Sequence, residues 1–330
     1  MAKKTSRKPL TGRVALVAGA TRGAGRGIAR ALADAGATVY CTGRSIKGKP
    51  SPYRRPETID ETATMITATG GTAIALRVDH TDEAAVKKLF RRITRAHPRL
   101  DIVVDSVAGE DPLMKSYGFL WDANVKTADA IFRQALTSRI VTAKHAALAM
   151  MPAQRGLIVE ITESDIIGGG GNPMAQAAKM AHKVLPLLWA AELAPHGITT
   201  MAVTPGFLRS ESMLEHFGVT EDNWRDGATQ DPNFLASESP LFVGRAIAAL
   251  AADKNVHRRT GQLLSSWELA RDYGVNDYDG RRPDWGRHTI DFSVLPKEWV
   301  DLFRTGADLQ LTWLTTIAAR TRKFRAKIPS

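Results

Sequence analysis

The chain has 330 residues, 44% of them hydrophobic, so it can bury a large core as one α/β domain with an appendage. Its formal net charge of +11 lies mostly in residues 1–10 and 318–330, which hold nine basic side chains and no acid; basic tails are therefore favoured over nucleic-acid binding. No apolar run reaches the ~18–20 residues of a membrane span, and the single cysteine, Cys41, excludes an internal disulfide. We expect a cytoplasmic protein with no nucleic-acid partner and no membrane span.

Short apolar runs alternate with helical patterns over residues 13–265, which predicts a doubly wound parallel sheet of the α/β class. Parallel strands are covered on both faces, so each predicted strand is mainly apolar. The strands are expected at residues 13–18, 38–42, 72–78, 100–106, 157–162, 198–203 and 262–265. The helices are expected at residues 25–35, 57–68, 82–95, 127–151, 175–194 and 241–252.

The alternating pattern predicts one domain with extensions at both ends. The domain is expected at residues 11–286, after a basic tail at 1–10 and before a helical extension with its own basic tail at 287–330. An apolar stripe at roughly helical spacing runs through the C-terminal extension. We expect this stripe to pack on the domain, although it could also pair subunits or lie on a membrane surface.

The connection at about residues 207–240 is unusually long. Connections of this length in a compact domain are typical of lids or disordered loops, and a lid is the interpretation favoured here. Its bulky side chains Phe207, Phe217, Trp224 and Phe234 could line an apolar pocket. Of these, we place Phe207, Phe217 and Trp224 in the predicted substrate pocket.

A glycine-rich turn follows the first predicted strand. Gly19 permits a tight turn, Gly23 lets the backbone approach a pyrophosphate, and Gly25 allows the helix to pack closely on the sheet. The phosphates would lie over the N-terminus of the following helix, where free N–H groups and the helix dipole attract an anion. A glycine trio in this place predicts dinucleotide binding.

Two arginines set the expected cofactor preference. A site that prefers NAD usually has an acid near the end of the second strand to bind the adenosine ribose. Here Arg44 follows that strand, and Arg22 lies within the glycine turn. Two guanidinium groups suit a 2′-phosphate, which arginine holds through paired hydrogen bonds. We therefore predict NADP(H), and we expect no metal ion.

Over residues 10–265 the chain resembles the short-chain dehydrogenase/reductase family. The family's Thr-Gly-x-x-x-Gly-x-Gly turn is similar to residues 18–25, with alanine in place of threonine. Its adenine-contacting aspartate matches Asp79, and its Asn-Asn-Ala-Gly segment is similar to residues 105–109. Its Pro-Gly turn beside the nicotinamide matches residues 205–206, with Ser210 in place of the usual threonine.

This resemblance implies a Rossmann-type fold, NADP(H) and a small-molecule substrate. It also implies a homodimer or homotetramer built through the predicted helices at 127–151 and 175–194. The cofactor contacts expected from the turn, the two arginines and the resemblance are Gly19, Thr21, Arg22, Gly23, Ala24, Gly25, Arg44, Ser45, Asp79, His80, Ala108, Gly109, Lys179, Pro205, Gly206 and Leu208.

The catalytic residues of the family match this chain only in part. In the family a tyrosine protonates the substrate oxygen, a lysine four residues later assists it, and a serine thirteen residues before it orients the substrate. The lysine matches Lys179, and the serine position holds Thr162. The tyrosine position holds Ala175, and the chain has no tyrosine between residues 118 and 272.

Several side chains could replace the tyrosine. The candidates are Glu163 and Asp165 after the fifth strand, Glu110 and Asp111 after the fourth, His182, and Lys179 itself. A carboxyl group in an apolar pocket can have a raised pKa and then serve as an acid. Ala175 also leaves space for a larger substrate. We select Lys179, Thr162 and Glu163 as catalytic candidates and add Asp165 and Ala175 to the predicted substrate pocket.

Three functions fit this pattern. The first is an NADP(H)-dependent oxidoreductase that acts on a carbonyl or an activated double bond of a small molecule, with an atypical active site. The second is a non-redox relative of the family, such as a dehydratase, cyclase or isomerase. The third is a catalytically inactive NADP(H)-binding protein. The glycine turn favours ligand binding in all three, and the first is the one we expect.

Overall fold

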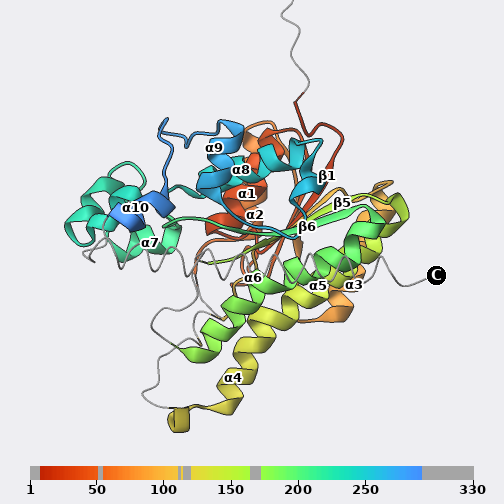
Figure 1. The fold of residues 1–330 in the computed structure, drawn as a ribbon, viewed down its shortest axis with the longest axis horizontal. Coiled ribbons are helices and arrows are strands. Elements are labelled where there is room, and N and C mark those ends of the chain that lie inside the picture. The colour runs from red at the N-terminus through yellow and green to blue at the C-terminus, as the bar shows by residue number, and fades with distance from the viewer. Residues whose placement is uncertain (1–7, 51–54, 111–112, 114–119, 164–171, 292–330) are drawn as a thin grey trace, which may run out of the picture.

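A single seven-stranded parallel sheet forms the centre of the computed structural model (Figure 1). The structure describes residues 8–50, 55–110, 113, 120–163 and 172–291. The strands stand in the order β3-β2-β1-β4-β5-β6-β7. Their bounds are β1 Val14–Ala18, β2 Thr38–Gly43, β3 Thr72–Arg77, β4 Ile102–Asp105, β5 Gly156–Ile161, β6 Ile198–Thr204 and β7 Leu263–Ser265. The doubly wound sheet predicted from the alternating pattern is confirmed, with strand ends within about two residues of expectation.

Helices cover both faces of this sheet (Figure 1). One apolar core joins β1, β4, β5 and β6 to α1 and α8, and a second joins the opposite face to α3, α5 and α6. The helix bounds are α1 Gly23–Asp34, α2 Ile59–Ala68, α3 Glu83–Ala96, α4 Val125–Phe132, α5 Ser138–Met150, α6 Pro173–Leu193, α8 Pro240–Ala252 and α9 Ser266–Tyr273. The order of strands reverses beside β1, between β1 and β4, which is where such sheets bind ligands at their carboxyl edge.

The helix predicted at 127–151 is divided. Residues 133–137 form a π-helical turn between α4 and α5. Nε2 of His182, on α6, lies 2.8 Å from the carbonyl oxygen of Ala135 within that turn. A side chain that donates to a backbone carbonyl can replace a hydrogen bond of the regular helix. His182 therefore stabilises the irregular turn.

The connection at 207–240 folds into a compact lobe, defined here as residues 207–239. It contains the short helix α7 (Glu211–His216) and two 3-10 turns, Trp224–Thr229 and Pro232–Ala236. The lobe lies beside α10 (Trp285–Asp291) at the left of Figure 1. Phe217, Trp224 and Phe234 are buried in its centre, so the lobe has an aromatic core of its own.

Much of both predicted extensions lies outside the described residues, including residues 1–7 and 292–330. The predicted packing of the C-terminal stripe and the domain boundaries therefore stay predictions. Within the described part of the chain, no helix is long and apolar enough to cross a membrane.

Candidate functional site

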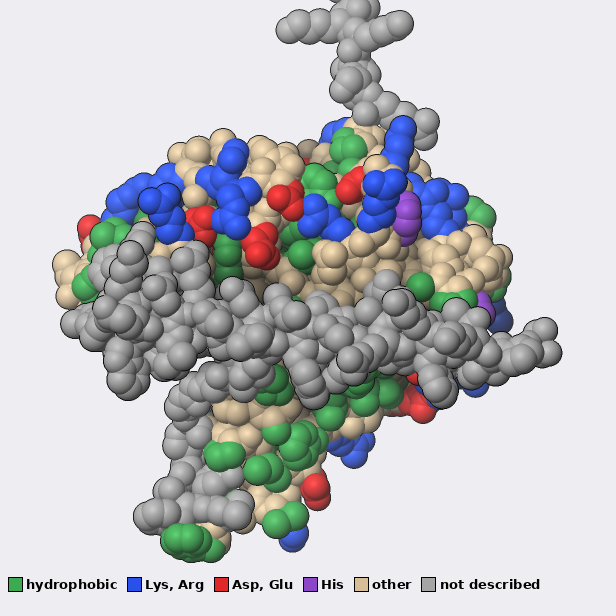
Figure 2. All heavy atoms as spheres, in the orientation of Figure 1, with side chains coloured by type: hydrophobic (Ala, Val, Ile, Leu, Met, Phe, Trp, Pro, Cys, Tyr) green, Lys and Arg blue, Asp and Glu red, His purple; other side chains and the backbone are tan. Residues whose placement is uncertain are grey.

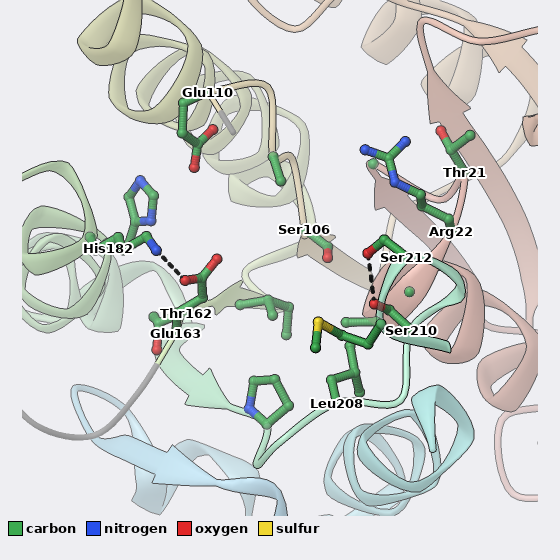
Figure 3. Close-up of a pocket in the computed structure, with 18 of the residues that line it drawn as sticks. Thr21, Arg22, Ser106, Glu110, Thr162, Glu163, His182, Leu208, Ser210 and Ser212 are labelled. Carbon is green, nitrogen blue, oxygen red and sulfur yellow. Dashed lines mark hydrogen bonds and ion pairs between the residues drawn. The ribbon is translucent and has the colours of Figure 1, made fainter. Parts of the chain in front are cut away.

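A cavity of about 550 Å³ opens at the carboxyl edge of the sheet, between the glycine turn and the lobe (Figure 3). Thr21 and Arg22 lie at one end, and Glu110, His182 and Glu163 lie at the other. Ten of the predicted cofactor residues line it: Gly19, Thr21, Arg22, Gly23, Ala24, Ala108, Lys179, Pro205, Gly206 and Leu208. The glycine turn and the predicted catalytic lysine therefore share one cavity.

The glycine turn between β1 and α1 is held by contacts that only glycine allows. Gly19 has a φ of +79°, and a Cβ there would lie 2.4 Å from the carbonyl oxygen of Ser106. A Cβ at Gly25 would lie 2.2 Å from the carbonyl oxygen of Gly19. The turn thus fits tightly against the end of β4, while Gly23 lines the cavity.

The N-terminus of α1 already binds an anion. The backbone N–H of Gly23 donates to Oε2 of Glu211, on α7 of the lobe, over 2.7 Å. Oε1 of Glu211 lies 3.3 Å from the guanidinium group of Arg26. The carboxylate of Glu211 occupies the position that a phosphate oxygen would take, because the same N–H groups and the helix dipole attract both anions.

The two predicted phosphate-binding arginines have different surroundings. Arg22 lines the cavity. Arg44 does not, and its guanidinium group donates to Oε1 of Gln134 over 3.1 Å, beside Gly109. The structure therefore brings Arg22, but not the side chain of Arg44, to the cavity.

Other predicted cofactor residues do not line the cavity. Asp79 accepts hydrogen bonds from the backbone and hydroxyl of Thr81; burial would raise the pKa of Asp79, but these bonds hold it below its ordinary value. His80 is buried between the hydroxyl groups of Thr42 and Thr142, and burial lowers its pKa. Ser45 is also buried. These contacts give Asp79 and His80 roles in holding the loop after β3.

At the other end of the cavity, the side chain of Lys179 forms an ion pair with the carboxylate of Glu163. Thr162, at the end of β5, is 2% exposed, and its hydroxyl has no hydrogen-bond partner among the described residues. A buried hydroxyl without a partner loses free energy unless a ligand or water supplies one. Thr162 also lines the cavity.

His182 and Glu110 line the same end of the cavity. Burial, aided by the charge of Arg139, lowers the pKa of His182 to about 2, so its imidazole is neutral. A neutral ring that donates from Nε2 to the Ala135 carbonyl leaves Nδ1 as an acceptor. Glu110 accepts a hydrogen bond from the backbone N–H of Gly109 over 2.7 Å.

A buried charge cluster beneath the cavity was not predicted. Arg139 of α5 lines the cavity and donates to Oε2 of Glu160 over 2.9 Å, and to the backbone carbonyls of Asp105 and Val107. Asp105 of β4 and Glu160 of β5 are register partners and are both buried. Burial, with the nearby Asp105 charge, raises the pKa of Glu160 to about 8 against the opposing effect of Arg139. The sequence did carry a signal for this buried cation: the acids Asp105 and Glu160 each lie within an apolar strand.

The predicted substrate pocket requires correction. Phe217 and Trp224 do not line the cavity, because they pack with Phe234 in the core of the lobe. Ala175 does not open space either; it is 2% exposed and packs in a small apolar cluster with Ile131, Ala135 and Ala178. Phe207 does line the cavity.

The remaining alternatives for the missing tyrosine divide between the described and undescribed parts of the chain. Asp111 and Asp165 lie outside the described residues. No tyrosine within the described residues lines the cavity. The candidates that the structure brings together are therefore Lys179, Glu163, Glu110 and His182.

Comparison with known proteins places this fold and cavity in a family. The model of the short chain dehydrogenase family matches residues 13–218. The chain is 34% identical over 278 residues to Dehydrogenase/reductase SDR family member 1 of Mus musculus, covering 83% of this chain and 85% of that protein. It is 29% identical to the 3-oxoacyl-(acyl-carrier-protein) reductase of Escherichia coli, covering 77% of this chain and 95% of that protein.

A solved structure of a short-chain dehydrogenase/reductase has a similar fold. A short-chain type dehydrogenase/reductase from Mycobacterium marinum is 26% identical and superposes with a TM-score of 0.63, covering 78% of this chain and 94% of the other. The family match spans more than half of the sequence, and the relatives named here are oxidoreductases. The chain belongs to the short-chain dehydrogenase/reductase family.

Proposed function

We propose that this protein is an NADP(H)-dependent oxidoreductase that reduces a carbonyl or an activated double bond of a small molecule. The observation that carries the proposal is the single cavity shared by the glycine turn and by Thr162, Glu163 and Lys179. The cofactor fits the residues present, because the α1 N-terminus already binds the Glu211 carboxylate and Gly23 lines the cavity beside it. Arg22 would bind the 2′-phosphate, and Arg44 would join it after releasing Gln134.

When bound, NADPH would supply the hydride that reduces the substrate carbon. In our proposal Thr162 donates a hydrogen bond to the substrate oxygen and orients it. Lys179 then gives a proton to that oxygen as charge develops, in place of the tyrosine that Ala175 replaces. Glu163, which is more exposed than Lys179, holds the ammonium group in place and connects it to solvent for reprotonation. General acid assistance of this kind typically supplies about 10²–10⁴-fold in rate.

The function is tested by titrating the purified protein with NADPH and NADH in parallel, following cofactor fluorescence, and then by assaying NADPH consumption with a panel of carbonyl compounds. We expect tighter NADPH binding, and we expect Arg22→Ala to weaken NADPH by about tenfold without changing NADH, because a charged hydrogen bond to the 2′-phosphate is lost. Equal binding of both cofactors would contradict the predicted preference. Bound NADPH that no substrate consumes would favour the non-redox or inactive alternatives.

Glu211 provides a second, independent prediction. Its carboxylate repels a pyrophosphate that approaches the α1 N-terminus, and it must leave the Gly23 N–H when a phosphate takes that bond. Glu211→Gln is expected to tighten NADPH binding severalfold at low salt, with a smaller gain at high salt because screening weakens the repulsion. Glu215→Gln, an acid on the same helix paired with Arg55, is the matched control and should leave the affinity unchanged. Unaltered binding by Glu211→Gln would remove Glu211 from the phosphate site.

We also propose that the protein assembles as a homodimer or homotetramer through α5 and α6 and acts in the cytoplasm. Large hydrophobic side chains are exposed on both helices, including Ile140, Leu148 and Leu188, and Figure 2 shows hydrophobic side chains gathered over these lower helices. An apolar surface of this kind favours burial against a second copy. Light scattering would test the assembly, which should have the mass of two or four chains.

The proposed cytoplasmic location agrees with the state of the single cysteine. Burial raises the pKa of Cys41 to about 12, so the thiol is protonated and suits a reducing compartment.

A further inference from the structure

A buried acid fixes the wall of the cavity that follows β6, the strand beside Thr162. Pro205, Gly206, Phe207 and Leu208 form this wall between β6 and the lobe. The backbone N–H of Gly206 donates to Oε2 of Glu238 over 2.9 Å. The turn that carries the wall is therefore bonded to a side chain 32 residues away in the sequence.

Glu238 also joins this turn to the rest of the fold. Its backbone N–H donates to the carbonyl oxygen of Phe207, and its carbonyl oxygen accepts from the N–H of Arg209, over 2.9 and 2.8 Å. The same Oε2 accepts from the hydroxyl of Ser266, in the first turn of α9, over 2.5 Å. Glu238 thus connects the Gly206 turn, the start of the lobe and the first residue of α9, which directly follows β7.

There is no room for a side chain at Gly206 beside this contact. A Cβ at Gly206 would lie 2.7 Å from the Cβ of Trp285 on α10 and 3.0 Å from Oε2 of Glu238. Glu238 is 1% exposed, and its Oε1 has no hydrogen-bond partner among the described residues. The carboxyl group is therefore enclosed on all the sides that the structure describes, with one oxygen bonded twice and the other not at all.

Burial, together with the charge of Asp277, disfavours the ionised form of Glu238. Burial raises the pKa of Glu238 to about 8, and Asp277 acts in the same direction, while the bonds from Ser266 and Gly206 and the charge of Arg209 oppose it. Arg209 is already shared by Glu221 and Asp277. The other charged or titratable groups on the packed elements are bonded elsewhere: Arg281 to Asp279, Glu268 to Ser265, and His288 to Asn233.

We propose that Glu238 is a positioning residue, whose carboxyl group holds the Gly206 turn in the geometry required by the nicotinamide end of the cofactor. This inference rests on the proposed binding of NADP(H) in the cavity. Ionisation would leave a buried carboxylate whose Oε1 has no hydrogen-bond partner among the described residues, and this cost disfavours the closed wall. Among the described residues, Glu238 makes no hydrogen bond to the glycine turn at α1, and the wall approaches Gly23 through the side chain of Leu208, so the phosphate end should respond much less to this change.

Calorimetric titration with two ligands tests the proposal. One ligand is NADPH, and the other is 2′-phospho-ADP-ribose, which keeps the pyrophosphate and the 2′-phosphate but lacks the nicotinamide. Glu238→Ala is expected to weaken NADPH by about tenfold, because the bond that fixes the turn is lost, and to leave 2′-phospho-ADP-ribose unchanged. Glu238→Gln, a neutral side chain of the same shape, should restore NADPH binding.

The pH dependence gives a second readout. Wild-type NADPH affinity should fall between about pH 7 and pH 9 as Glu238 ionises, whereas Glu238→Gln should show no such fall. Asp277→Asn is the control for general loss of lobe stability; it should lower the melting temperature without a selective loss of NADPH. If Glu238→Ala does not fold, Ser266→Ala removes the second bond to Oε2 and should weaken NADPH alone.

The outcomes separate this inference from the proposed function. Equal weakening of both ligands by Glu238→Ala, or an alkaline fall that persists in Glu238→Gln, would overturn the positioning role while NADP(H) binding stands. Failure of wild-type protein to bind either ligand would overturn both.

Discussion

Replacing Lys179 with methionine is expected to reduce the turnover number by about 10²–10⁴-fold, the usual contribution of a general acid. Lys179 lines the cavity and is paired with Glu163, and no tyrosine within the described residues lines that cavity. The developing alkoxide would then be left without a proton donor. Single-turnover oxidation of bound NADPH, followed by absorbance, measures the chemical step directly.

Lys179→Arg separates proton transfer from charge. A guanidinium group keeps the positive charge but does not release its proton in proteins. We therefore expect Lys179→Arg to retain NADPH affinity and to lose turnover almost as fully as the methionine variant. Lys144→Met is the matched control, since Lys144 forms a 2.7 Å ion pair with Glu83 outside the cavity. Turnover by Lys179→Arg at the wild-type rate would assign the proton to another group.

Replacing Arg139 with methionine is expected to destabilise the fold by about 3–5 kcal/mol, because one partner of a buried ion pair is removed. Its guanidinium group is 6% exposed and is bonded to Glu160 and to two backbone carbonyls. Without it, Glu160 and Asp105 face each other across neighbouring strands with no cation between them. The free energy of unfolding in urea measures the effect.

The stability lost on replacing Arg139 should depend on pH. The pKa of Glu160 is about 8 in the folded protein and close to 4.5 when unfolded, so ionisation of Glu160 costs the folded state stability as pH rises between these values. Removing Arg139 raises the folded pKa further, so the deficit of Arg139→Met should grow above about pH 8, where Glu160 ionises in the wild-type fold but stays protonated in the variant.

Two variants check the source of this deficit. Adding Glu160→Gln to Arg139→Met should recover part of the stability and flatten the pH dependence. Arg259→Met breaks a more exposed pair with Asp272 and should cost only about 0–1 kcal/mol. A loss as large in Arg259→Met would show that burial of the Arg139 pair is not the cause.

The strands and the glycine turn were predictable because their signals are local. Each strand is an apolar run, and Gly19, Gly23 and Gly25 stand together directly after the first of these runs. The helix at 127–151 was less predictable, since its π-helical turn depends on His182 from a helix later in the chain.

The residues that complete the cavity were harder to identify. Glu211 meets Gly23 across 188 positions of sequence, and Glu238 meets Gly206 across 32. Pairings at such separations are set by tertiary packing, which periodicity does not report. Phe217 and Trp224 were misplaced for a related reason: an aromatic side chain in a connection suits a binding pocket and the core of a small lobe equally well.

The π-helical turn at residues 133–137 also sets the rotational register between α4 and α5. Each residue of an α-helix advances the next by about 100° around the axis. A π-helical turn advances each residue by less than this, so the five residues of this turn carry the chain about as far round the axis as four α-helical residues would. The turn therefore takes up one extra residue while the face of α4 that carries Ile131 stays against α6.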